Sequence, residues 1–206
     1  DIIKKLCHSI IEPVPSLFTF NIKDPRIKGL AGISLENAEI SVANSEFVES
    51  GPLLITHWGI SGPAVLKLSS WGAFDLADRM YYFPILINWA ANFEPEEVMA
   101  ACMGEREANP RKRIQNHAMF GIPLRLWKNL ADACGIKNTH NWADLSNKQL
   151  SEFVEELTAS FFQVSGKSTY KDEFVTAGGV DLKEVNFKRF ESKIQPGLFF
   201  AGEILN

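Results

Sequence analysis

One segment of the 206-residue sequence combines a titratable side chain with the expected start of a helix. In THWGISGPAVLKLSSWG, a strand would end at Thr56 and His57, and a short helix would begin at Pro63. Histidine is the side-chain type that exchanges protons near neutral pH, so His57 is a candidate proton donor. Ser61 would lie at the helix N-terminus, where free N–H groups favour an anion. From spacing alone, a capped helix packed under a barrel explains the same residues.

A pair of glycines forms a second candidate site. Gly178 and Gly179 follow Thr176 in the segment VTAGGV. Because glycine has no Cβ, such a pair lets the backbone lie close to a flat ligand, although a plain turn uses glycine in the same way. No metal site is expected, because the three cysteines and four histidines are scattered along the chain.

Composition sets limits on partners and location. The net charge is −4, and the longest basic run, residues 111–113, is interpreted as a solvated helix face. We therefore expect neither a nucleic-acid nor a membrane partner. Unpaired cysteines and the lack of a signal peptide or a spanning segment favour a cytoplasmic protein.

These candidate residues must be positioned by an α+β fold. Residues 1–11 have the apolar spacing of a helix that Pro13 and Pro15 would end. Short strands follow to about residue 91, and the run 197–200 predicts a final strand buried on both faces. Between the two β regions lie three expected helices, with start signals at Pro95, Pro123 and the Ser146–Gln149 capping box.

A helical block between two β regions indicates an inserted subdomain whose flanking strands still pair. We expect a β-barrel-like subdomain interrupted by a small helical subdomain. The expected divisions are residues 1–12, the barrel (13–93 and 161–186), the helical subdomain (94–160) and residues 187–206.

Four motifs in a fixed order carry a family resemblance: PVPSLFTF (13–20), GPLLITHWGISGPAVLKLS (51–69), VTAGGV (175–180) and ESKIQPGLFFAGE (191–203). With them the chain resembles bacterial predicted NAD(P)/FAD-dependent oxidoreductases, in which a barrel and a helical insert interrupt the flavin-binding domain. This family includes bile-acid-reductase-like flavoproteins. The resemblance implies that residues 1–12 are a remnant of the flavin domain and that residues 187–206 are the start of its C-terminal segment.

The resemblance implies roles for particular residues. Gly202 and Glu203 would form the late flavin fingerprint, in which the acidic side chain accepts hydrogen bonds from sugar or ribityl hydroxyls. Thr176, Gly178 and Gly179 would lie near the isoalloxazine ring. Thr56, His57 and Ser61 would orient the substrate or donate a proton from the insert side.

The sequence contains no Gly-x-Gly-x-x-Gly fingerprint for a dinucleotide-binding βαβ unit. We therefore interpret the chain as an excised insert region, inactive by itself and without bound FAD, whose partner is the remainder of its flavin-binding domain. The whole protein would pass hydride through FAD, from NADH or NADPH, to a small organic acceptor.

Two alternatives stay open. The chain could be a stand-alone binding or interaction module without redox activity. It could also belong to a flavoprotein that acts on RNA, but the acidic balance and the lack of a basic stripe argue against this.

Overall fold

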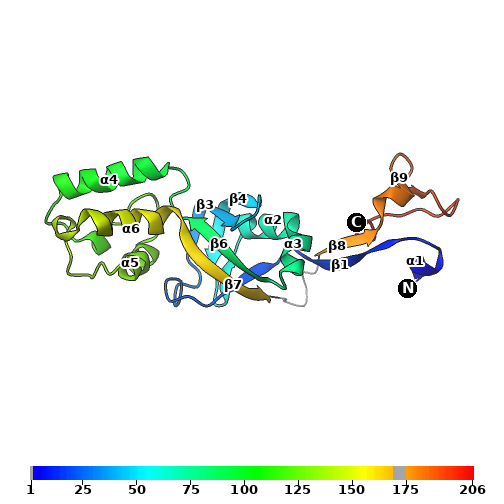
Figure 1. Cartoon of the computed structure of the whole chain (residues 1–206), viewed down its shortest axis with the longest axis horizontal. Helices are drawn as coiled ribbons and strands as arrows, with labels where there is room; N and C mark the ends of the chain where they lie inside the picture. Colours follow the sequence, from blue (N-terminus) through cyan, green and yellow to red (C-terminus); the bar gives the residue numbers. More distant parts are fainter. Residues whose placement is uncertain (1, 169–174) are drawn as a thin grey trace.

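The computed structural model describes residues 2–168 and 175–206. The molecule is elongated, with a helical subdomain at one end, a β-barrel in the middle, and a two-stranded ribbon leading to a small lobe that holds both termini (Figure 1). This architecture confirms the predicted α+β class with a barrel and a helical subdomain.

Six antiparallel strands close the barrel in the order β2-β5-β4-β3-β6-β7. Closure leaves no exposed edge, which explains how such short strands are stable. Buried and more exposed side chains alternate along the strands. In β6, for example, Phe83, Ile85 and Ile87 are buried while their neighbours are more exposed. The strands are β2 (Thr19–Ile22), β3 (Ser34–Val42), β4 (Val48–Ile55), β5 (Gly59–Ser61), β6 (Tyr82–Asn88) and β7 (Ser160–Ser168).

The helical subdomain is inserted between β6 and β7. These strands pair directly across the insertion, from Tyr82 opposite Ser165 to Ile87 opposite Ser160, so the insertion leaves the barrel closed. The three α-helices pack around a shared apolar core in which the rings of Trp127 and Phe153 meet edge to face at 4.9 Å. The helical elements are α4 (Pro95–Ala108), η1 (Ile114–Asn116), α5 (Leu124–Ala133), η2 (Trp142–Asp144) and α6 (Asn147–Thr158).

The predicted capping box at the start of α6 is present. The Ser146 hydroxyl accepts a hydrogen bond from the Gln149 backbone N–H at 3.2 Å, and the Gln149 side chain accepts one from the Ser146 N–H. We expect Ser146→Ala to lower the free energy of unfolding by about 1 kcal/mol, since one helix donor loses its partner. Urea denaturation measures this. Ser151→Ala, an exposed position inside α6, is the control and should change stability by only a few tenths of a kcal/mol; equal losses in both variants would contradict the capping role.

Helices α2 (Pro63–Trp71) and α3 (Ala73–Asp78) cover the barrel on the side that leads to the ribbon (Figure 1). The buried Ser69 hydroxyl accepts a hydrogen bond from the Phe18 N–H at 2.9 Å. The Ser16 hydroxyl also lies 3.2 Å from that of Ser70. These contacts tie the helix to the segment that enters the barrel.

The ribbon consists of β1 (Ile10–Ser16) paired antiparallel with β8 (Val175–Val180). It ends in the small lobe, whose apolar core contains three buried side chains among the described residues: Val180, Val185 and Phe200. The remaining lobe elements are α1 (Ile2–Lys5), η3 (Leu182–Glu184), β9 (Val185–Asn186) and β10 (Glu191–Ser192).

Two sequence predictions about the ends were wrong. The predicted helix at 1–11 stops at Lys5, and both prolines lie inside strand β1. Within the described residues β1 pairs on one side only, and its register shifts between Ile11 and Val14, so proline is tolerated there.

The predicted last strand at 197–200 is an irregular segment. It pairs on one side only, through hydrogen bonds between residues 190–192 and Leu198 and Phe200. Phe200 is buried but Phe199 is 56% exposed, because no second neighbour covers the other side within the described chain.

Candidate functional site

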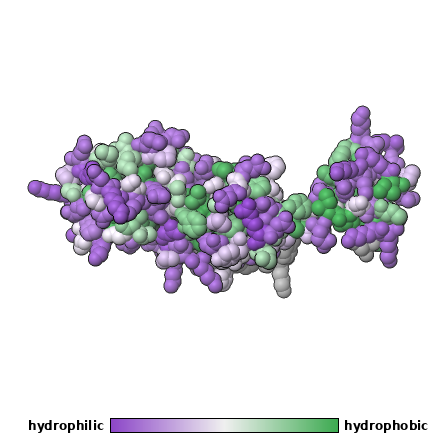
Figure 2. All heavy atoms as spheres, viewed as in Figure 1, coloured by the Kyte–Doolittle hydropathy of each residue, from purple (hydrophilic) through white to green (hydrophobic). Residues whose placement is uncertain are grey.

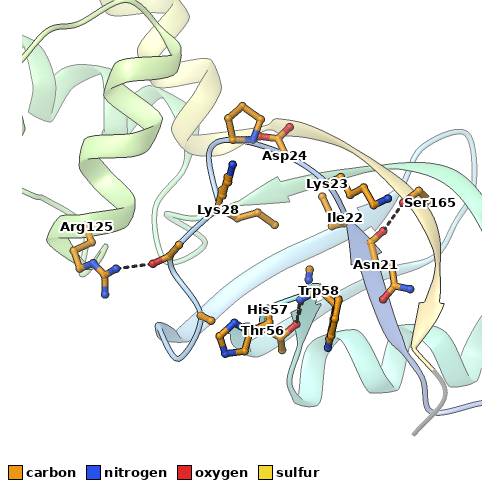
Figure 3. Close-up of a pocket in the computed structure, with 15 residues that line it drawn as sticks. Asn21, Ile22, Lys23, Asp24, Lys28, Thr56, His57, Trp58, Arg125 and Ser165 are labelled. Atoms are coloured by element: carbon orange, nitrogen blue, oxygen red, sulfur yellow. Dashed lines mark hydrogen bonds between the residues drawn. The ribbon is translucent and has the colours of Figure 1, made fainter.

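A cavity of about 1000 Å³ lies where the barrel meets helix α5 (Figure 3). Four parts of the chain form its walls: residues within 21–31 at and after β2, the β4–β5 hairpin at 56–59, Arg125 on α5 and Ser165 on β7. Its volume is at the upper end of the range of ligand pockets in proteins. The side chains of Lys23, Lys28, His57 and Trp58 in its lining are exposed, so the cavity is an open groove.

The groove is basic although the chain as a whole is acidic. Lys23, Lys28 and Arg125 line it, against the single carboxylate of Asp24. That carboxylate is already paired, because Arg26 donates to both of its oxygens at 2.9 and 2.7 Å. We call this groove, with Lys23, Lys28, Arg125, His57 and Trp58, the basic pocket.

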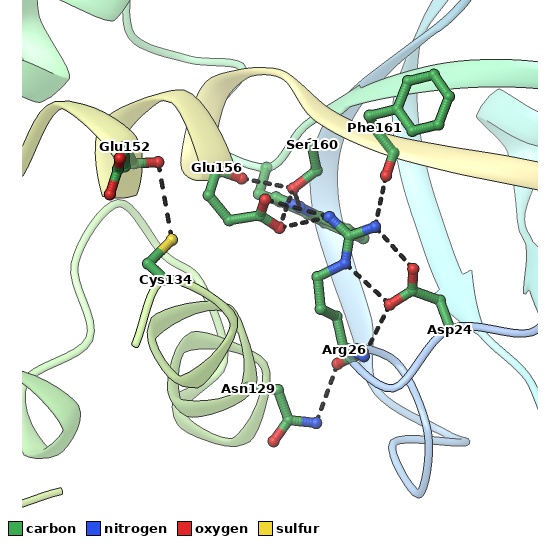
Figure 4. Close-up of polar contacts among 9 residues, drawn as sticks. Asp24, Arg26, Asn129, Cys134, Glu152, Glu156, Ser160 and Phe161 are labelled. Atoms are coloured by element: carbon green, nitrogen blue, oxygen red, sulfur yellow. Dashed lines mark hydrogen bonds and ion pairs between the residues drawn. The ribbon is translucent and has the colours of Figure 1, made fainter. Parts of the chain in front are cut away.

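Arg26 holds the pocket loop against the rest of the molecule (Figure 4). Its guanidinium also bonds Glu156 at the end of α6 at 2.8 Å and donates to the Phe161 carbonyl of β7. Its own carbonyl accepts a hydrogen bond from Asn129 of α5 at 3.0 Å. The loop, the barrel and two helices are therefore fixed relative to one another by one residue.

Electrostatics around Arg26 favour the charged forms. Burial raises the pKa of Asp24, but hydrogen bonds from Arg26 and its positive charge outweigh burial, so the pKa lies below its usual value. Burial likewise disfavours the charged Arg26, yet bonds to Asp24 and attraction to Glu156 raise its pKa overall. Both groups stay ionised across the physiological range.

The β4–β5 hairpin presents His57 and Trp58 at the rim. The Thr56 hydroxyl accepts hydrogen bonds from the N–H groups of Trp58 at 3.3 Å and Gly59 at 3.2 Å, which fixes the turn. The Trp58 carbonyl accepts from Ile22 N–H at 2.9 Å and so anchors the hairpin to β2. Trp58 is 60% exposed, an unusual position for so large an aromatic side chain.

Of the three substrate-side candidates, the structure places two in this pocket. Thr56 and His57 line it, whereas Ser61 is not among its lining residues. Ser61 precedes Gly62, which is the N-cap residue of α2 and makes no side-chain cap. The expected helix start is therefore present.

The candidate cofactor residues lie on the ribbon and in the small lobe. Thr176 is opposite Pro15 in β8, and Gly178 and Gly179 are in the same strand rather than in the expected loop. A Cβ on Gly178 would meet the Glu12 carbonyl at 2.8 Å, and one on Gly179 would meet the Ile204 carbonyl at 2.4 Å. The two glycines thus allow the chain's own backbone to approach closely.

Gly202 and Glu203 form an open turn beside that strand. The Val180 N–H donates to the Ile204 carbonyl at 2.8 Å, which holds the turn next to β8. Gly202 has φ +79°, and a Cβ there would have no heavy atom within 4 Å. An exposed carboxylate next to an open glycine backbone fits the recognition of a sugar or ribityl hydroxyl.

The structure gathers the candidates into two groups rather than one. Thr56 and His57 face α5, while Thr176, Gly178, Gly179, Gly202 and Glu203 lie on the ribbon and lobe, with the barrel between the two groups (Figure 1). Sequence reasoning missed Lys23, Lys28 and Arg125, which belong to no motif, and Trp58, which directly follows His57. Among the described residues, no group of three or more His, Cys, Asp or Glu side chains could hold a metal ion.

Residues 14–175 match the family model described as the HI0933-like protein barrel and H2TH domain. The chain belongs to this family. The match covers the barrel and helical subdomain just described.

Three relatives refine the comparison. The chain is 29% identical to the ribosomal RNA dihydrouridine synthase of Escherichia coli (92% of this chain, 45% of the relative) and 29% identical to that of Haemophilus influenzae (96% and 46%). It is 21% identical to the 3-dehydro-bile acid delta(4,6)-reductase of Clostridium scindens (98% and 50%). The chain therefore spans about half the length of these curated relatives.

The sequence-based expectation of no nucleic-acid partner was wrong. Two relatives at 29% identity are named for a reaction on ribosomal RNA, and the match extends over nearly all of this chain. Net charge misled the prediction because it averages over the surface, whereas recognition depends on local charge.

Within the described parts of the chain, no helix is long and apolar enough to cross a membrane.

Proposed function

We propose that the protein to which this chain belongs is a flavin-dependent reductase of carbon–carbon double bonds that acts on uracil bases of ribosomal RNA. The observation that carries this proposal is the similarity to two ribosomal RNA dihydrouridine synthases over more than nine tenths of the chain. Dihydrouridine differs from uridine by two hydrogens across one ring double bond. The name of the bile-acid delta(4,6)-reductase also denotes reduction of a double bond. This supports the proposal that the relatives share one type of reaction and differ in the acceptor.

Bound FAD would supply the hydride chemistry, with NADH or NADPH as the reductant, and the protein's own residues would bind and orient the cofactor and the substrate. We propose that Glu203 accepts a hydrogen bond from a sugar or ribityl hydroxyl and that Gly202 allows its close approach. We propose that Thr176, which is on the adjoining ribbon, is a further flavin contact. Gly178 and Gly179 act indirectly, because they let β8 pack against β1 and the Gly202–Glu203 turn.

The small lobe has the properties of part of a larger domain. Its buried core is too small to stabilise a separate domain, and apolar side chains are exposed on its surface (Figure 2). We propose that residues 1–12 and 187–206 belong to the flavin domain, with the barrel (13–93 and 161–186) and the helical subdomain (94–160) inserted into it. The exposed apolar residues of the lobe are Ile2, Phe187, Phe190, Ile194, Phe199 and Ile204.

A second candidate substrate is a fused-ring acceptor of the bile-acid type. The similarity to the bile-acid reductase extends over 98% of the chain, at lower identity. Its hydrophobic rings would need an apolar pocket. RNA is the first candidate because the two ribosomal RNA dihydrouridine synthases match at the higher identity, 29% against 21%.

The test uses the protein from the full gene. We expect it to retain FAD after desalting, to be bleached by NADH or NADPH, and to convert uridine to dihydrouridine in ribosomal RNA, detected as a mass gain of two hydrogens. Glu203→Gln should weaken FAD binding by about three- to tenfold, because the amide oxygen accepts the hydrogen bond more weakly than the charged carboxylate. Glu12→Gln, an exposed carboxylate on the ribbon, is the matched control and should bind FAD normally.

Two results would reject the proposal. If the protein retains no FAD, the oxidoreductase assignment fails and the stand-alone binding module is favoured. If it retains FAD but reduces a bile-acid-type enone and leaves ribosomal RNA unchanged, the substrate assignment fails.

A further inference from the structure

We propose that the basic pocket binds a single-stranded segment of the RNA, away from the reacting base. This inference rests on the proposed function and adds the surface that holds the substrate. The segment's phosphates would contact Lys23, Lys28 and Arg125, and one of its bases would stack on Trp58 (Figure 3).

The charges of the pocket fit a phosphate backbone. Lys23 and Lys28 are exposed on one loop, and Arg125 reaches the groove from α5. Among the described lining residues the one carboxylate, Asp24, is neutralised by Arg26 and does not repel an anion. Three cations thus face the groove in a chain of net charge −4, so the local field is opposite in sign to the overall charge.

The aromatic side chain fits an unpaired base. Trp58 is 60% exposed on a hairpin whose turn is fixed by Thr56, so the backbone that carries its ring is held at the rim. Proteins that bind single-stranded nucleic acids combine a cationic groove with aromatic rings on which bases stack. His57 lies beside Trp58 on the same rim and adds a ring with hydrogen-bonding nitrogens.

The shape and place of the pocket favour a polymer over a small molecule. An enclosed site buries most of a small ligand, whereas this groove is open and lined by exposed side chains. The barrel separates it from the proposed flavin contacts at Gly202 and Glu203 (Figure 1). A small acceptor cannot occupy both places, but an RNA strand is long enough to contact both.

The pocket is also rigid enough for recognition. Arg26 joins the lysine-bearing loop to β7 and α6 through the Phe161 carbonyl and Glu156, and its carbonyl accepts from Asn129. The Arg125 guanidinium donates to the Gly29 carbonyl, which holds α5 against the same loop. The cations therefore keep their spacing without RNA, and less ordering is needed on binding.

The test measures anisotropy of a fluorescein-labelled, single-stranded, uridine-rich RNA titrated with this chain at several salt concentrations. We expect Lys28→Glu to weaken binding at least tenfold and to reduce the salt slope by about 0.7 or more, because a phosphate contact is lost. Trp58→Ala should weaken binding by about tenfold to a hundredfold with the salt slope unchanged, because stacking is lost. The matched controls are Lys148→Glu and Trp71→Ala, both highly exposed and outside the pocket, which should bind within twofold of wild type.

Binding of Lys28→Glu and Trp58→Ala at wild-type affinity would overturn the inference. The inference would also fail if polyglutamate and RNA bound with equal affinity and Trp58→Ala changed neither affinity, since the groove would then be a general anion surface. The proposed function is judged separately. If the full protein carrying Lys28→Glu forms dihydrouridine as well as wild type, the proposed function stands and the pocket inference fails. If the pocket variants lose RNA binding but the full protein modifies no RNA, the pocket inference stands and the proposed function is rejected.

Discussion

Replacement of Gly59 by alanine is expected to lower the free energy of unfolding by about 3 kcal/mol or more, because the new methyl group overlaps backbone in a closed barrel. A Cβ at this position would lie 2.1 Å from the Phe20 carbonyl oxygen and 2.6 Å from the Ile22 nitrogen. Both atoms belong to β2, which pairs with β5 at this point, so neither can move without opening the barrel. Urea denaturation followed by tryptophan fluorescence measures the loss.

Gly29→Ala is the matched control for this change. Gly29 is in the same pocket lining and has φ +76°, but a Cβ there would have no heavy atom within 4 Å. Its replacement should lower stability by only about 1 to 2 kcal/mol, the strain of a left-handed conformation. A loss in Gly59→Ala no larger than in Gly29→Ala would show that β2 and β5 do not pack as described.

Replacement of Arg26 by leucine is expected to lower the free energy of unfolding by about 3 to 5 kcal/mol, because two largely buried carboxylates lose their partner. The side chains of Asp24 and Glu156 are only 20% and 15% exposed. The guanidinium also lies over the Phe162 ring at 3.9 Å, a contact that leucine replaces only in part. RNA binding should weaken as well, since Lys23 and Lys28 are on the loop that Arg26 holds.

Lys148→Leu is the control for Arg26→Leu. Lys148 pairs with Glu152 on α6, but their side chains are 85% and 48% exposed, so its loss should change stability by less than about 1 kcal/mol. Equal effects of the two variants in urea denaturation would show that the Arg26 network is not a stabilising centre.

The Arg26 network also predicts the direction of acid sensitivity. The folded pKa of Asp24 is lower than its unfolded value of about 3.9. The stability that this shift contributes is therefore complete above pH 3.9 and is lost as pH falls through the lower, folded value. Arg26→Leu should lose less stability than wild type over that acidic range.

The local pattern predicted much of the fold correctly. Capping residues and apolar periodicity marked α4, α5 and α6, because helix starts depend on neighbours within one turn. The same local reading failed at Pro13 and at 197–200, because a strand also depends on what pairs beside it. Strand identity is decided by contacts that are distant in sequence.

Four motifs in order indicated the family, and local apolar spacing with helix-start signals indicated the α+β class. Only the tertiary structure separated the candidate residues into a pocket beside α5 and a ribbon with its small lobe. It also formed the basic pocket, which has no sequence motif. Lys28 and Arg125 are almost one hundred positions apart, and barrel closure with the docking of α5 brings them to one groove. Charge in a linear sequence shows only neighbours along the chain, whereas the field that a ligand meets is summed over neighbours in space.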